Sequence, residues 1–393
     1  MNKKQQAGGG IQWGRMLKKL NPYTIQKGFR YLKHYGPKEF WIRLHERFEP
    51  EEVPYGPWYE AYIPDKAELE KQKKHKFAYT PRISVAVPAF RTPEVFLRQM
   101  IQSLLDQTYP NWELCIANGS PDDTEMTAIL KEYASADRRI CVRDLGENLG
   151  IAGNTNAALT MASGEFVGLL DHDDLLAPNA LYEIVKKLNE DRELDAVYTD
   201  EDKVTTDLSE HFQPHLKPDF NLDLLRSNNY ICHFFVVRKV GGFRQEFDGA
   251  QDHDFIFRCV EEASGRVGHV PEIVYHWRTH KASTADNPAS KMYAFDAGKR
   301  AIEAHLKRVG VEGEVSHTPD LGFFRVKYPV HGEPMVSIII PNKDEKESLQ
   351  ACIESIREKT EYQNYEILII ENNSTSEEIF HYYKELSRDP KIR

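Results

Sequence analysis

The chain has 393 residues, enough for two or three domains, and its 40% hydrophobic and 11% aromatic content is globular rather than disordered. The net charge of −10 argues against a general nucleic-acid binder, and no apolar run approaches the roughly 18 residues that cross a bilayer. The five cysteines are scattered and lack Cys-x-x-Cys spacing, which argues against a disulfide scaffold and a thiolate zinc site. The opening segment does not resemble a secretory signal, and both observations predict a cytoplasmic location.

The first 48 residues are basic, with eleven Lys and Arg side chains against Glu39 and Glu46. Breaks at Asn21-Pro22 and Gly36-Pro37 predict short helices. The last of these helices places four apolar side chains on one face, namely Phe40, Trp41, Leu44 and Phe48. Two interpretations stay open: an interfacial helix on an anionic membrane surface, or a helical extension packed on the main domain with its charges solvated.

Residues 49–80 are expected to be a connector, which completes an N-terminal extension over 1–80. From residue 82, short apolar runs alternate with amphipathic helical segments. The predicted strands are 83–87, 112–117, 140–143, 165–170 and 195–199. The predicted helices start at Pro93 with Thr92 as the cap, at 120–123, at Ala152 and after Pro178. This alternation predicts an α/β domain over 81–330, with a mostly parallel sheet flanked by helices.

The sequence then repeats itself. Residues 336–341 echo 83–88, and residues 365–374 echo 112–120 with one residue inserted. The proline-to-asparagine spacing is 30 positions from Pro88 to Asn118 and 31 from Pro341 to Asn372. We therefore expect 335–393 to be a partial second copy of the α/β unit. Such a short segment cannot close the sheet that the first copy needs, which favours a piece of a longer two-domain protein over a vestigial copy.

The clearest chemical signal is Asp171-His172-Asp173-Asp174, which directly follows the buried run 166–170. In an extended backbone, Asp171 and Asp173 project to the same side, where two carboxylates can bind a hard divalent cation. An acidic turn that caps the next helix is the plainer interpretation. Ligands gather at the carboxyl ends of strands in open α/β sheets, and this location favours the functional interpretation. Neither a Gly-x-Gly-x-x-Gly fingerprint after the first strand nor a P-loop motif is present.

Three weaker signals follow. Asp252, in the segment 248–254, opens a predicted helix and could serve as a general base or merely cap that helix. His280 closes the polar segment 276–280, although a lone histidine is usually structural. Asparagines flank Gly150 and Gly153 in a loop that could approach a nucleotide, namely Asn148, Asn154 and Asn156.

Taken in order, these stretches resemble family 2 glycosyltransferases with the GT-A fold. The matching stretches are 83–88, 103–109, 117–120, 148–152, 171–174, 251–252 and 278–280. Within the family, the chain is most similar to bacterial enzymes that build surface polysaccharides, often with two transferase domains in tandem. The resemblance implies an inverting hexosyltransferase-type reaction that uses a UDP- or dTDP-sugar and a divalent cation, Mn²⁺ or Mg²⁺.

By that similarity, Asp173 would hold the metal, with His280 near the metal or the diphosphate, and Asp252 would deprotonate the acceptor hydroxyl. The residues expected to bind the nucleotide-sugar are Pro88, Ala89, Asn118, Asn148, Asn156, Asp171 and Arg278. Two positions depart from the family pattern. Asn118 stands where the family commonly has Asp, and Gln251 replaces the acidic neighbour of the base.

The prediction is thus a metal-assisted transferase of surface polysaccharide assembly, with a glycan, lipid-linked or protein-linked acceptor. It would be cytoplasmic, with docking to the inner face of the plasma membrane through the basic segment as a further hypothesis. One alternative is a sugar-nucleotide nucleotidyltransferase, which would need a glycine-rich basic signature where only Arg91 is found. Another is a degenerate transferase domain that serves as a scaffold, against which the intact carboxylates argue.

Overall fold

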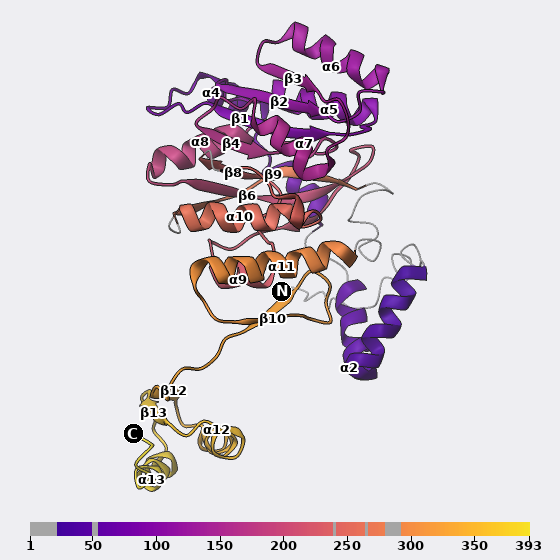
Figure 1. Ribbon diagram of the computed structural model, residues 1–393. Coiled ribbons are helices and arrows are strands. Elements are labelled where there is room, and N and C mark those ends of the chain that lie inside the picture. Colours follow the sequence, from indigo (N-terminus) through magenta and orange to yellow (C-terminus); the bar gives the residue numbers. More distant parts are fainter. Residues whose placement is uncertain (1–21, 49–53, 239–240, 264–265, 280–291) are drawn as a thin grey trace. The chain divides into compact units, whose positions relative to one another are not determined.

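The computed structural model describes residues 22–48, 54–238, 241–263, 266–279 and 292–393 (Figure 1). The chain divides into two compact units, Met1–Lys327 and Tyr328–Arg393. Among the helices of the described ranges, none combines the length and the apolar character that a membrane span requires.

The first unit is built on a nine-stranded sheet with the order β3-β2-β1-β4-β8-β6-β9-β5. Its parallel half contains β1 (Ile83–Ala89), β2 (Trp112–Asn118), β3 (Ile140–Asp144) and β4 (Phe166–Leu169). The other half contains β5 (Leu175–Leu176), β6 (Ala196–Thr205), β8 (Phe235–Arg238) and β9 (Val267–Thr279), and β7 (His211–His215) pairs with β6. Strand β8 runs antiparallel between β4 and β6, and β6 and β9 are parallel.

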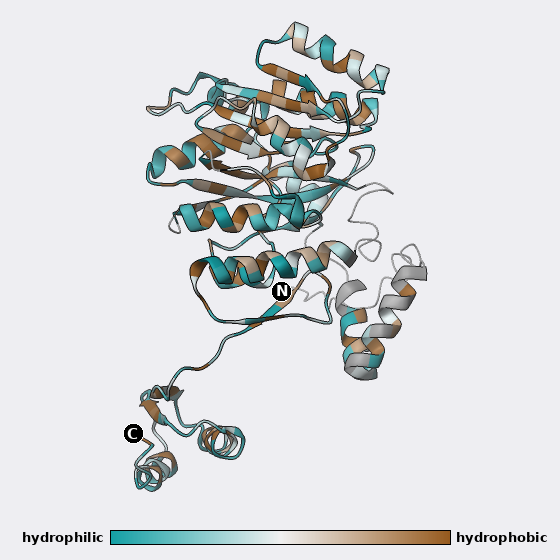
Figure 2. Ribbon diagram, in the orientation of Figure 1, coloured by the Kyte–Doolittle hydropathy of each residue, from teal (hydrophilic) through white to brown (hydrophobic). Residues whose placement is uncertain are grey.

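Helices cover both faces of this sheet (Figure 1). One face packs against α5 (Glu94–Leu105), α6 (Thr124–Ala136) and α8 (Ala180–Glu190). On the other face, α7 (Gly150–Leu159) packs on the small residues of β1 and β2, and α10 (Gln251–Glu262) packs with α9 (Leu222–Ser227) and α11 (Met292–Val309). Figure 2 shows the hydrophobic strands enclosed by helices whose outer residues are hydrophilic. The expected fold class, a mostly parallel α/β sheet flanked by helices, is confirmed.

Short elements complete the first unit. They are the 3₁₀ turn η1 (Gln245–Phe247) and the hairpin of β10 (Glu314–His317) and β11 (Phe324–Lys327). At the start of α6, Asp123 accepts a hydrogen bond from the backbone of Met126, as the acidic segment predicted. Helix α5 begins at Glu94 with Pro93 as the N-cap residue, so the prediction of Thr92 as the cap is wrong by one residue. The Thr92 hydroxyl instead lies 2.9 Å from Nδ1 of His172.

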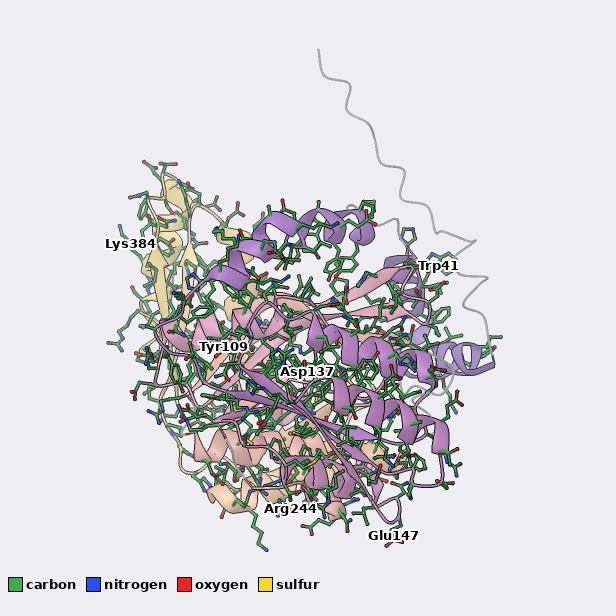
Figure 3. All side chains as sticks on the ribbon, turned by 90° about the horizontal axis from the view of Figure 1, so that it is seen from above. Trp41, Tyr109, Asp137, Glu147, Arg244 and Lys384 are labelled. Atoms are coloured by element: carbon green, nitrogen blue, oxygen red, sulfur yellow. The ribbon has the colours of Figure 1, made fainter. Side chains whose placement is uncertain are left out.

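Residues 22–48 are helical. Helix α2 (Pro22–Phe48) has non-helical backbone angles at Gly36, with φ 83° and ψ 171°, where the sequence predicted a break. The other predicted break includes residue 21, which lies outside the described residues. Trp41, labelled in Figure 3, is 53% exposed. The expected connector contains two helices, α3 (Tyr55–Tyr62) and α4 (Lys66–Lys74).

A row of tyrosines holds helix α3 on strands β6 and β9. The Tyr55 hydroxyl donates to Asp202 at 2.7 Å, and the Tyr59 hydroxyl lies 3.1 Å from Nε2 of His276. The Tyr62 hydroxyl donates to Glu272. The spacing of these three residues places them on one face of the helix. The region expected to be only a connector is therefore part of the packed structure.

The second unit repeats the opening of the first. Its elements are β12 (Val336–Asn342), α12 (Lys346–Lys359), β13 (Tyr365–Glu371) and α13 (Glu377–Leu386). Strands β12 and β13 are parallel and pair Val336 with Tyr365, just as β1 and β2 pair Ile83 with Trp112. The turn is also shared, because the backbone amides of Arg91 and Asp344 each donate to a serine hydroxyl, at 2.8 and 3.0 Å.

The register corrects one detail of the sequence repeat. Ala89 pairs with Asn118 in the first unit, and the equivalent Asn342 pairs with Glu371 in the second. Glu371, rather than Asn372, therefore occupies the position of Asn118. The inserted residue follows the strand, where Asn373 adopts a left-handed backbone with φ 55°.

Gly164 tests how closely the chain before β4 packs on the start of β1 in the first unit. A Cβ atom at this position would lie 2.5 Å from the carbonyl oxygen of Arg82 and 2.9 Å from the backbone nitrogen of Ser84. Gly164→Ala should lower the free energy of unfolding by about 1–3 kcal/mol, because the backbone must shift to relieve the overlap. Urea denaturation of both variants measures this change. The control is Gly146→Ala, at which a Cβ meets nothing within 4 Å. Equal stability of the two variants would contradict the packing described.

Candidate active site

A cavity lies at the carboxyl end of the parallel strands. Pro88 reaches it from β1, Asp171 from the turn after β4, Asp252 from the first turn of α10, and Tyr275 from β9. Cys232 and His233 border it from the segment that precedes β8. The fold thus brings Asp171 and Asp252, from distant segments, to one cavity.

The carboxylates of the acidic turn after β4 lie in two different environments. Asp174 is buried, where it accepts hydrogen bonds from the backbone nitrogen of Arg278 at 2.8 Å and from the Tyr275 hydroxyl. Asp171 is half-buried on the cavity wall, and none of the described residues donates a hydrogen bond to its side chain. Burial, then the charge of Asp173, and to a smaller degree the charge of Asp252 raise the pKa of Asp171.

This turn fits a divalent cation on chemical grounds. Two carboxylates at positions i and i+2 supply hard oxygen ligands, for which Mg²⁺ and Mn²⁺ are suited. The mutual repulsion that raises the pKa of Asp171 is a cost that a bound cation would remove. His280, the other expected ligand, lies outside the described residues.

Arg278 lies beneath the turn rather than on the cavity wall. Its side chain is fully buried, and its guanidinium donates to the carbonyl of Asp173 at 2.7 Å and to Gln99 at 2.6 Å. The same group stacks on the ring of Phe96, 4.3 Å from its centre. The guanidinium also donates to the carbonyl of Thr206 at 3.1 Å, so its contacts hold the turn after β4 to the end of β6. Its expected role in nucleotide-sugar binding stays a prediction.

The three asparagines expected near the nucleotide form hydrogen bonds with other residues of the fold. Asn118 donates to Thr127 at 3.0 Å and to Asp144 at 2.9 Å, and accepts from the amide of Ser120. These bonds fasten the end of β2, and the side chain is fully buried. Ala89, at the end of β1, is likewise fully buried.

Asn148 and Asn156 shape the loop and helix after β3. The side-chain oxygen of Asn148 accepts from Gly150 at 3.1 Å and from Asn154 at 2.9 Å. Asn156 makes two bonds to the backbone of Phe243, at 2.6 and 2.8 Å. None of the three asparagines lines the cavity, so a direct contact with a nucleotide stays a prediction.

The general-base candidate is held by two donors. Oδ2 of Asp252 accepts from Nδ2 of Asn229 at 2.9 Å and from the thiol of Cys232 at 2.7 Å. Sequence reasoning did not find Asn229 or Cys232, because they belong to no local motif. They approach Asp252 only when β8 and α10 pack together.

A buried ion-pair network supports the same wall of the cavity. Glu201 accepts from the amide of His233 at 2.6 Å, from Nδ1 of its ring at 3.0 Å, and from the ammonium group of Lys217 at 3.2 Å. Burial alone would lower the pKa of His233, but Glu201, with Asp174 and Asp171, raises it to about 9. The imidazole is thus a cation beside the carboxylates of the cavity at neutral pH.

A second group of ligand-type side chains lies at α3. Asp202, His211 and His276 offer atoms within 4.8 Å of one another. Both histidines approach Asp202 through Nδ1, at 2.9 and 2.6 Å, and Nε2 of His276 contacts Tyr59. Since these groups satisfy one another, the cluster is complete as a hydrogen-bond network that anchors α3.

A sequence model described as glycosyl transferase family 2 matches residues 84–247 and 337–393, together more than half of the chain. The chain therefore belongs to the family 2 glycosyltransferases, as the sequence analysis expected. Both stretches of the match begin at the first strand of a unit, Ser84 in β1 and Ser337 in β12.

Among its relatives, O-antigen biosynthesis protein RfbC of Myxococcus xanthus is 34% identical over 373 residues, which cover 94% of this chain and 29% of the relative. The chondroitin synthase of Pasteurella multocida is 30% identical over 60% of this chain and 23% of its own length. The chain spans about a third of the length of two curated relatives that it matches. A crystal structure of TarS of S. aureus with UDP-GlcNAc aligns at 19% identity and a TM-score of 0.47, over 57% of this chain and 66% of that one.

The raised pKa of His233 predicts a pH dependence of stability. A histidine whose pKa is higher in the folded than in the unfolded state stabilises fully below the unfolded value, about 6.5, and loses that contribution as pH rises through about 9. Without divalent cations, the unfolding free energy should fall across this range by a contribution on the order of 3 kcal/mol.

Chemical denaturation at pH 6.5, 8 and 9.5 measures this fall. His233→Gln should flatten the profile, whereas His317→Gln, at a surface-exposed histidine paired with Asp296, serves as the control. A steep fall that persists in His233→Gln would show that the network described does not carry the effect.

Proposed function

We propose that the chain is an inverting glycosyltransferase that moves a sugar from a UDP- or dTDP-linked donor to a glycan or glycoconjugate in surface polysaccharide synthesis. The observation that carries the proposal is the shared cavity of Asp171 and Asp252. Family membership supports sugar transfer, and the names of the relatives support the polysaccharide. The nucleotidyltransferase alternative finds no support in the family match.

The proposed reaction is a single displacement. The acceptor hydroxyl, deprotonated by Asp252, attacks the sugar carbon from the face opposite the diphosphate, so the configuration inverts. The base must then lie across the cavity from the group that holds the diphosphate. This arrangement is supported by Asp252, at the start of α10, and Asp171, in the turn after β4, which come from distant segments of the chain and line the same cavity.

The turn after β4 would hold the donor. We assign Asp173 and His280 to a divalent cation, Mn²⁺ or Mg²⁺, and Asp171 to the nucleotide-sugar. A bound cation would supply positive charge against the charge that develops on the leaving diphosphate. The proposed nucleotide-sugar pocket also includes Pro88, which lines the cavity, Asn118 at the end of β2, Asn148 in the loop after β3, and Asn156 in α7.

We also infer that the second unit is the opening part of a second transferase domain. Its registers, its turn and its family match parallel those of the first unit. In addition, Ile339 is 64% exposed, whereas the equivalent Ala86 is buried under α7. An apolar sheet face of this kind normally lies under a helix.

Association with an anionic membrane surface is a further part of the proposal. The basic N-terminal segment supplies charge, and Phe29 and Trp41 of α2 are exposed. Basic segments with exposed aromatic residues bind anionic bilayers through charge and partial burial of the rings.

Two variants separate the base from the cation site. Asp252→Asn should lower sugar transfer by at least a hundredfold and leave the affinity for the nucleotide-sugar with Mn²⁺ within about twofold, because it removes only the base. Asp173→Ala should instead weaken donor binding that depends on Mn²⁺. Nucleotide release from UDP- and dTDP-sugars measures transfer, and calorimetry measures binding.

The matched control is Asp223→Asn, at an exposed aspartate of α9, which should leave both properties unchanged. Equal loss of binding and transfer in Asp252→Asn would argue against its role as a base. Full activity of the wild-type protein in EDTA would remove the metal from the proposal.

The membrane hypothesis predicts sedimentation with liposomes that contain phosphatidylserine at low salt, and release at 0.5 M NaCl. Trp41→Ala should reduce the bound fraction, because the exposed indole no longer enters the interface. Failure of these liposomes to retain the wild-type protein at low salt would end the hypothesis.

A further inference from the structure

The segment Asn229–His233, between α9 and β8, faces the general-base candidate. Asn229 and Cys232 donate to the same carboxylate oxygen of Asp252, Oδ2, at 2.9 and 2.7 Å. Nδ2 of Asn229 also lies 3.0 Å from the Cys232 sulfur, so the three groups form one cluster. Among the described residues, no group donates to the other oxygen, Oδ1.

Toward Asp252, Cys232 acts as the donor, while its sulfur accepts from Nδ2 of Asn229. Burial, followed by the charge of Asp252 and the hydrogen bond to it, raises the pKa of the thiol well above its ordinary value. The thiol is therefore protonated at neutral pH, and its proton is directed at Oδ2. A thiol in this state is a poor nucleophile, which argues against covalent catalysis by Cys232.

The backbone of the segment is itself fixed. Lys217 is buried, and its ammonium group donates to the carbonyl of Ile231 at 3.1 Å, to the carbonyl of Cys232, and to Glu201 at 3.2 Å. Glu201 in turn accepts from the amide of His233 at 2.6 Å. The two donors to Asp252 are thus attached to a clamped stretch of chain, which limits their movement.

We propose that Asn229 and Cys232 are positioning residues that hold Asp252 through Oδ2 and leave Oδ1 to accept the proton of the acceptor hydroxyl. The inference rests on the proposed function, in which Asp252 is the base. As the acceptor O–H bond breaks, its proton passes to Oδ1, and the oxygen electron pair forms the bond to the sugar carbon. The bond from that carbon to the diphosphate oxygen breaks, and its electrons leave with the diphosphate.

The proposal predicts a specific kinetic signature for Cys232→Ala. A hydrogen bond to a charged group contributes about 1.5–3 kcal/mol, so kcat near pH 6.5 should fall about tenfold or more. The acidic limb of the pH–rate profile should move to higher pH, because a carboxylate that loses a donor holds its proton more tightly. KM for the donor should change less than twofold. Cys232→Ser, which restores an O–H donor, should recover most of both effects.

The measurement is nucleotide release by the full chain with Mn²⁺, from whichever of UDP-glucose, UDP-N-acetylglucosamine and dTDP-rhamnose the wild-type protein turns over fastest. Cys259→Ala is the matched control, since it removes another buried thiol, on α10, that does not line the cavity. Wild-type kcat and pH profile in Cys232→Ala would overturn the proposal. An inactive Asp252→Asn beside it would leave the proposed function standing.

A second measurement needs no sugar donor. Asp252→Asn removes the negative charge that, after burial, contributes most to raising the pKa of the Cys232 thiol, so iodoacetamide at pH 8 should label Cys232 faster than in the wild-type protein. Mass spectrometry of the Cys232 peptide gives the rate, with the Cys259 peptide as the internal reference. An unchanged rate at Cys232 would contradict the hydrogen bond between these side chains and overturn the proposal.

Discussion

Mutual repulsion among carboxylates at one end of a sheet is the constraint on which the first unit depends. Asp171 and Asp174 both have pKa values raised by burial and by the charge of Asp173, and Asp252 adds to the repulsion at Asp171. A fold that gathers these groups away from water loses stability unless cations or donors compensate for them. Cationic groups around the cavity compensate for the charge of these carboxylates.

The buried Arg278 and Lys217 and the half-buried His233 supply much of this compensation. The guanidinium of Arg278 donates to the carbonyl of Asp173, and the backbone amide of the same residue donates to the side chain of Asp174. His233, protonated because of Glu201, adds positive charge at the cavity wall, and Lys217 balances Glu201 in turn. The positive charge thus comes from β9 and from the chain around β7 and β8, whereas the turn itself follows β4. A nucleoside diphosphate with a divalent cation would enter a cavity whose electrostatics are already arranged.

The sequence alone was enough to predict the part of the site that follows the parallel strands. Alternating buried strands and amphipathic helices predicted β1 to β4, and the acidic turn after β4 could be located from the apolar run before it. In the other half of the sheet, only the start of β6 was predicted, as the strand 195–199. Cys232, His233 and Glu201 carry no motif, and only the pairing of β8 with both β4 and β6 brings them to the cavity.

Two details show why residue spacing alone misleads. Asn156 falls in a glycine-rich stretch that suggests a ligand, yet both ends of its amide bind the backbone of Phe243, more than eighty residues away. The repeat aligned Asn372 with Asn118 by residue type, whereas the strand register gives that position to Glu371. Hydrogen-bond partners and register, which depend on the tertiary structure, decide both cases.

The central claim is that the turn after β4 and the start of α10 face each other across one donor site. Anomalous diffraction from crystals grown with Mn²⁺ and a nucleoside diphosphate tests it most directly. The account predicts a manganese peak at Asp173, with the diphosphate beside it and Asp252 on the opposite wall. A peak at Asp202, His211 and His276, with none at Asp173, would contradict it, as would a diphosphate bound away from this cavity.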